Sequence, residues 1–65
     1  MTEVMKQLLV FLRNAVKYNN SKDINLYNEI LLRTIQDQPI LKNNEEISEA
    51  LKMVKEFYQQ NQTNQ

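Results

Sequence analysis

The first predicted helix, over about residues 2–18, is apolar around half of its circumference, and this feature constrains the fold most. At about 100° per residue, its apolar side chains form two adjacent stripes. The first stripe contains Met5, Leu8, Leu9, Leu12 and Val16, and the second contains Val4, Phe11, Ala15 and Tyr18. A helix packed on one neighbour needs an apolar arc of only about 100°. This helix therefore has to be covered from two directions.

The second stripe, extended by Leu8, is the predicted contact surface. Its residues Val4, Leu8, Phe11, Ala15 and Tyr18 follow the 4-3-4-3 spacing of a packing seam. Met5, Leu9, Leu12 and Val16 repeat the same rhythm one residue later. One seam can face the second helix, and the other either faces the third helix or meets another chain. The small size of the chain favours another chain, with Val4, Phe11 and Tyr18 as anchors.

The length and the missing residue types limit how such a chain is stabilised. The chain has 65 residues and therefore forms one domain at most. It contains no Cys and no His. A chain of about 60 residues buries only about 60% of its unfolded surface, so its stability is marginal. Disulfides and zinc sites of the Cys/His kind are excluded. Association with another chain remains as the stabilising device.

Two further helices are expected, over about 22–37 and 44–59. Ser21 or Asp23 is the predicted N-cap of the second helix, which ends before Pro39 because proline disfavours the helical region for the preceding residue. Asn43 is the predicted cap of the third helix, with Glu46 completing a capping box. The second helix points one apolar face inward, namely Ile24, Tyr27, Ile30, Leu31, Thr34 and Ile35. The third has a seam of Ile47, Leu51, Val54 and Tyr58, with Ala50 and Phe57 beside it.

The links between these helices are short, which favours antiparallel neighbours. In the first break, at residues 19–21, asparagine is expected in the left-handed conformation that ends a helix, since the chain has no glycine. Ile40 and Leu41 in the second link are expected to tuck under the helices. The prediction is an all-α fold of three short helices, in an up-down-up bundle or a helical-hairpin arrangement that dimerises. Residues 1–59 form the domain, and 60–65 form a disordered polar tail.

Catalytic, cofactor and metal sites are not expected. Without histidine, Ser21 and Ser48 have no imidazole base to activate them. Without glycine, no glycine-rich phosphate-binding loop can form. Glu45 and Glu49 lie one turn apart, where they are more typical of a solvated first helical turn than of acid–base chemistry. We therefore expect a non-enzymatic protein with no small-molecule substrate.

Lys6, Arg13 and Lys17 form a basic stripe on the first helix, which suggests an alternative function. These cations could contact phosphates or anionic lipid in a small accessory DNA-binding or membrane-surface protein. However, the eight basic and eight acidic residues of the whole chain cancel, whereas nucleic-acid-binding domains normally carry a basic excess. Nucleic acid and membrane surfaces are therefore not the expected partners.

The sequence predicts a small protein–protein interaction module: an adaptor, regulator or inhibitor that presents the apolar face of its first helix. Its partner is expected to be a second copy, in a homodimer, or another helical protein. No apolar run approaches the ~18 residues of a membrane span, and no signal peptide is recognisable, so a cytoplasmic location is expected. The bias toward Asn, Lys and Ile is typical of AT-rich genomes, such as those of low-GC Gram-positive bacteria or their phages.

Overall fold

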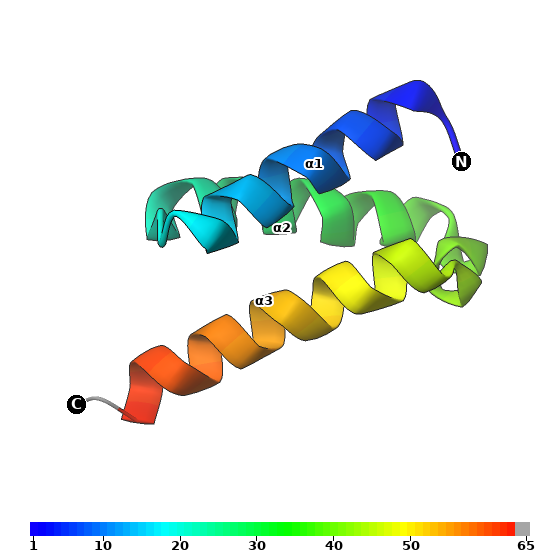
Figure 1. Ribbon diagram of the computed structural model, residues 1–65. Helices are drawn as coiled ribbons and strands as arrows, with labels where there is room; N and C mark the ends of the chain where they lie inside the picture. Colours follow the sequence, from blue (N-terminus) through cyan, green and yellow to red (C-terminus); the bar gives the residue numbers. More distant parts are fainter. Residues whose placement is uncertain (64–65) are drawn as a thin grey trace.

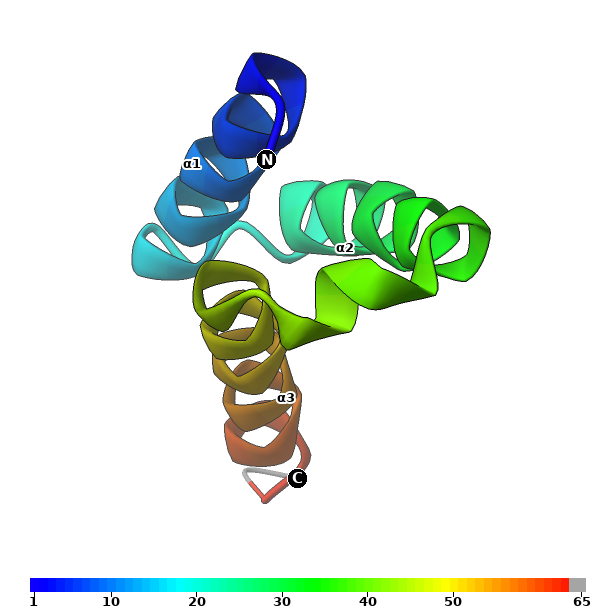
Figure 2. The ribbon, with the colours of Figure 1, turned by 90° about the vertical axis from the view of Figure 1, so that its right-hand side faces the viewer.

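Three α-helices make up almost all of the part of the chain that the computed structural model describes, residues 1–63. The elements are α1 (Glu3–Lys17), α2 (Ser21–Asp37), the short 3₁₀ helix η1 (Pro39–Asn43) and α3 (Glu45–Thr63). Consecutive α-helices run in opposite directions (Figure 1). Viewed from the right-hand end of Figure 1, the three helices lie at the corners of a triangle (Figure 2). The described residues thus confirm the all-α class. The bounds of α1 and α2 and the start of α3 lie within one residue of the expected positions, whereas the end of α3 does not.

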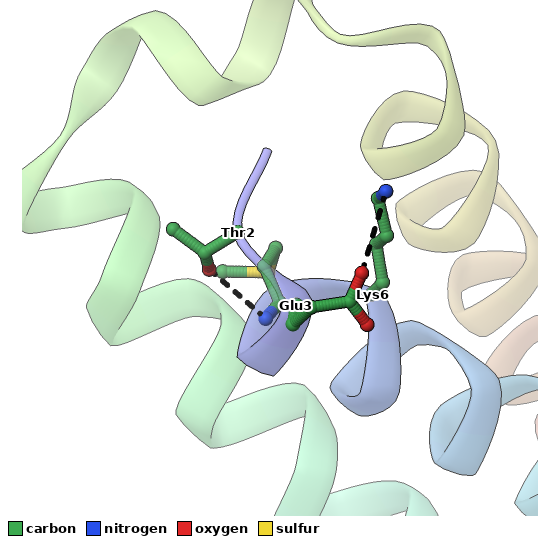
Figure 3. Close-up of polar contacts among 4 residues, drawn as sticks. Thr2, Glu3 and Lys6 are labelled. Atoms are coloured by element: carbon green, nitrogen blue, oxygen red, sulfur yellow. Dashed lines mark hydrogen bonds and ion pairs between the residues drawn. The ribbon is translucent and has the colours of Figure 1, made fainter.

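Thr2 is the N-cap of α1 and directly precedes its first turn. Its Oγ1 accepts a hydrogen bond from the backbone N–H of Met5 at 3.2 Å, which satisfies one of the free donors at the helix start (Figure 3). Glu3 lies in the first turn, where the helix dipole favours an acidic side chain. Its carboxylate also pairs with Lys6 Nζ at 3.7 Å.

Asn19 ends α1 in the left-handed conformation, with φ of 57°, as expected for a chain without glycine. Its backbone N–H donates to the carbonyl of Val16 at 3.1 Å, and the next N–H, that of Asn20, donates to the carbonyl of Ala15 at 2.9 Å. This pair of bonds is a Schellman motif. The motif reverses the chain within three residues and brings α2 alongside α1.

The N-caps of α2 and α3 each lie one residue away from a predicted position. Asn20, rather than Ser21 or Asp23, caps α2, because its Oδ1 accepts from the N–H of Asp23 at 3.1 Å. Asn44, rather than Asn43, caps α3, because its Oδ1 accepts from the N–H of Glu46 at 2.9 Å and of Ile47 at 3.3 Å. In both places several residues that can cap a helix are adjacent in sequence, so residue type alone did not select among them.

The link between α2 and α3 is only partly buried. Pro39 occupies the first turn of η1, where its missing N–H is not needed. Leu41 packs against the core as predicted. Ile40 does not, since 75% of it is exposed. The tight 3₁₀ turn places successive side chains in different directions, so the two neighbours cannot both face inward.

Each α-helix contributes to one apolar core, and α1 packs against both other helices. The core consists of Met5, Leu9, Leu12 and Ala15 of α1, Ile24, Leu31 and Ile35 of α2, and Ile47, Ala50, Val54 and Phe57 of α3. No polar or charged side chain among the described residues is buried. The seam predicted for α3 is rotated, because Ala50 and Phe57 are buried whereas Leu51 and Tyr58 are half-buried.

The last helix is longer than predicted. α3 continues to Thr63, whereas the sequence placed its end near residue 59 and a disordered tail over 60–65. Asn61 Nδ2 donates to the carbonyl of Phe57 at 2.8 Å, which ties the added turn to the preceding one. Residues 64 and 65 of the predicted tail lie outside the described residues.

Candidate interaction surface

The two apolar stripes of α1 have separate locations in the folded chain. Met5, Leu9 and Leu12 of the first stripe are buried in the core, and Val16 packs against them. The residues predicted to bind a partner lie mostly outside the core: Val4, Phe11 and Tyr18 are 79%, 48% and 73% exposed, and Leu8 is half-buried. Ala15 of that set is instead buried, at 6% exposed, and belongs to the core.

The exposed stripe of α1 lies beside an exposed part of α2, and the two helices enclose a groove of about 370 Å³. The groove is lined by Thr2, Val4, Met5, Gln7, Leu8 and Phe11 of α1 and its cap, and by Ile30 and Thr34 of α2. Ile30 is 43% exposed. Thr34 cannot offer its hydroxyl proton freely, because Oγ1 donates to the carbonyl of Ile30 at 2.8 Å. The groove therefore presents an uncharged and mostly apolar surface.

Phe11, which lines this groove, stacks on Tyr27 of α2. Their rings stack with centroids 5.8 Å apart and planes inclined by 27°. Beyond them lies a second hollow of about 180 Å³, whose lining includes Phe11, Ala15, Tyr18 and Tyr27. Phe11 thus forms a wall of both hollows. We call the surface made by Val4, Leu8, Phe11, Tyr27 and Ile30 the α1–α2 face.

Charged groups lie beside the α1–α2 face and not within it. None of the residues lining the groove is charged, and Asp23 is the one charged residue that lines the second hollow. On α2, Arg33 Nη2 pairs with Glu29 Oε1 at 2.9 Å, and both side chains are largely exposed. By helical spacing this ion pair follows the outer edge of the face, next to Leu26 and Ile30.

A further hollow, of about 410 Å³, lies between α2 and α3 and is lined by Leu32, Leu51, Val54, Lys55 and Tyr58, among others. Tyr58 donates its hydroxyl proton to Asn25 Oδ1 and so links the two helices at this place. The lining includes an ammonium group and the amides of Asn28 and Gln59. This hollow is larger but more polar than the groove of the α1–α2 face.

Lys6, Arg13 and Lys17 of the predicted basic stripe are all exposed. By helical spacing they lie on the side of α1 opposite Leu8 and Phe11. Two of them already have close neighbours, since Lys6 pairs with Glu3 and Lys17 Nζ lies 5.7 Å from the centre of the Tyr18 ring. The basic stripe and the α1–α2 face are therefore separate surfaces that separate substitutions can test.

Ile30 and Tyr27 are the residues of the face that the sequence analysis assigned elsewhere, namely to the core side of the second helix. A signal for them was present. With Leu26 and Leu32 included, the apolar arc of α2 is wider than a single packing contact requires. In the structure this surplus divides between two sides of α2, because Ile30 lines the groove beside α1 whereas Leu32 lines the hollow beside α3.

Comparison with protein-family models, with curated proteins and with solved structures finds no match to this chain. In the part of the chain that the structure describes, no helix has the length and apolar character needed to cross a membrane. The described residues also contain no group of three or more acidic, His or Cys side chains arranged to hold a metal ion.

Proposed function

We propose that this protein is a non-catalytic interaction module that binds a protein partner through the α1–α2 face. The observation that carries the proposal is the exposure of Val4, Phe11 and Ile30 around an uncharged groove. Contiguous apolar surface of this kind on a small protein usually marks an interaction site. Aromatic side chains at its centre are typical of the residues that dominate binding energy.

A helical partner suits this surface. The groove runs between two antiparallel helices, as do the grooves that receive the apolar side of an amphipathic helix. Phe11 and Val4 lie on the same side of α1, about two turns apart, which matches the spacing at which a partner helix repeats its anchors. Phe11 is 48% exposed, so covering the rest of it contributes roughly half of the about 1.5–3 kcal/mol expected for full burial of such a side chain.

The anionic-ligand role of Lys6, Arg13 and Lys17 is the second proposal, and it has weaker support. The chain as a whole has no net charge, so no long-range attraction brings it to phosphates. Glu3 neutralises one end of the stripe. Binding to three phosphates would also be weak and strongly salt-dependent.

Site-specific photo-crosslinking in the cells that produce the protein tests the proposed function. A photoreactive amino acid replaces Val4, on the face, and in a second variant it replaces Val10, which is also exposed but does not line the groove. We expect a discrete protein adduct from position 4 and none from position 10. Absence of an adduct at position 4, or equal labelling at both positions, would overturn the proposal.

A further inference from the structure

We propose that the occupant of the α1–α2 face is a second copy of this chain, related to the first by a two-fold axis. The inference rests on the proposed function and names its partner. In such an isologous dimer each copy contributes the same surface, so the surface has to be complementary to itself. Charge, area and the arrangement of one ion pair support this complementarity.

Charge favours a second copy. The groove contains no ionised group, so two copies of it meet without burying an unpaired charge. The entire chain also has equal numbers of basic and acidic residues, and two identical copies therefore do not repel each other as they approach. A strongly charged partner would gain nothing from this surface.

The available area is sufficient. α2, the longer helix of the hairpin, has 17 residues and is therefore about 25 Å long, and side chains add about 3 Å at each edge. With a backbone width of 17 Å for the molecule, the α1–α2 hairpin covers roughly 700 Å² in plan. Stable interfaces bury about 800 Å² on each partner. The accessible area of a grooved surface exceeds its plan area. A copy seated along the whole hairpin would therefore bury about what a stable dimer needs, whereas one short peptide would cover only part of it.

The Glu29–Arg33 pair gives the dimer its expected register. The two residues lie one turn apart at the edge of the face, with opposite charges. A two-fold axis perpendicular to α2 makes the copies of α2 antiparallel. When this axis passes at the level of residue 31, midway between the two charged residues, Glu29 of each copy approaches Arg33 of the other. The interface then contains two equivalent attractive contacts, each between Glu29 of one copy and Arg33 of the other.

The molar mass in solution is the first test. Sedimentation equilibrium of the full chain over a wide concentration range should give a mass of twice 7.8 kDa at the upper end. Ile30→Lys should raise the dimer dissociation constant by at least about tenfold, as expected for the loss of a central contact. The matched control is Val10→Lys, which replaces a comparably exposed apolar residue outside the groove and should leave the mass unchanged.

Circular dichroism of each variant distinguishes loss of the dimer from unfolding of the chain. Both variants should retain the helix content of the parent chain, because the replaced side chains lie outside the core. A chain that is monomeric at every concentration, or a dimer that Ile30→Lys leaves intact, would overturn the second copy as occupant. A monomer that still forms an adduct at position 4 with another protein would retain the proposed function and overturn only this inference.

Complementary charge variants test the register. Glu29→Lys leaves two positive charges at the edge of α2, and Arg33→Glu leaves two negative charges. Each variant alone should dimerise more weakly than the parent. An equal mixture, with one variant labelled for detection, should form the mixed dimer in preference to either homodimer. A mixture that shows no such preference would overturn the antiparallel arrangement of α2.

Discussion

Adjacent residues on α1 have opposite environments, and their substitution should have opposite consequences. Leu12 is completely buried, whereas Phe11 is about half exposed and forms a wall of two hollows. A step of one residue turns a helix by about 100°, which is enough to move from the interior to the surface. Stability and association are therefore assigned to different residues of the same helix.

Leu12→Ala should lower the free energy of unfolding by about 2–5 kcal/mol, because it removes buried volume that its neighbours cannot refill. Urea titration followed by circular dichroism measures the loss. The loss is a large fraction of the total for a chain of this size, whose stability is on the order of 3–10 kcal/mol. Val10→Ala is the control, and an equal loss from both variants would contradict the described core.

Asn19 is the residue whose backbone conformation restricts substitution most. Asn19→Ala should lower the stability by about 1 kcal/mol, because a side chain with a Cβ and no polar group disfavours positive φ. Asn19→Gly should not destabilise the chain, since glycine adopts that conformation without steric conflict. Thermal or urea unfolding distinguishes the two. If alanine proved as stable as glycine here, the Schellman motif at the end of α1 would be wrong.

At the scale of elements, periodicity predicted the three helices, but it did not predict how each one is turned toward the core. Helix positions depend on local spacing and capping residues, which the sequence contains. Rotation depends on which neighbour packs closest. In α3 the small side chain of Ala50 lies in the core, so Leu51 and Tyr58 are displaced toward the side of the helix. No property of the isolated segment distinguishes these orientations.

The same reason explains what was found and what was missed at the α1–α2 face. Val4, Phe11 and Tyr18 could be singled out because α1 has more apolar surface than one neighbour covers. Ala15 could not be separated from them, since its position in the stripe is compatible with either environment. Ile30 and Tyr27 were assigned to the core because the relative placement of two helices depends on tertiary packing.

The start of α3 gives a direct test at this scale. Asn44→Ala should lower the stability by about 1 kcal/mol, because the backbone N–H groups of Glu46 and Ile47 lose their acceptor. Asn43→Ala, one residue earlier, removes no capping bond and should have little effect. Chemical denaturation of both variants measures the difference. The reverse order would favour the capping box that the sequence suggested.

At the scale of the whole molecule, α1 connects the fold to its surface. It packs against both other helices, while its outer stripe contributes to the groove. A partner bound at the face would hold α1 in place and thereby stabilise the entire bundle by mass action. Association and folding are consequently linked, as expected for a chain with a core this small.

Salt distinguishes the two surfaces of the molecule. Raising the salt concentration from low to moderate should leave the dimer mass nearly unchanged, because apolar contacts dominate the α1–α2 face. Lys17→Glu should likewise leave it unchanged, since Lys17 lies on the opposite side of α1. A dimer that dissociates in salt and that Lys17→Glu also disrupts would transfer the interaction to the basic stripe. Light scattering measures both effects.

The double use of α1 also bears on how such a chain can evolve. On this helix one side builds the interior and the adjacent side forms the groove, so few positions can drift without consequence. The solvent side of α3 contributes neither to the interior nor to the groove. Homologous sequences should therefore keep the apolar rhythm of the first seventeen residues and the buried positions of α3, while they diverge freely along the solvent side of that last helix.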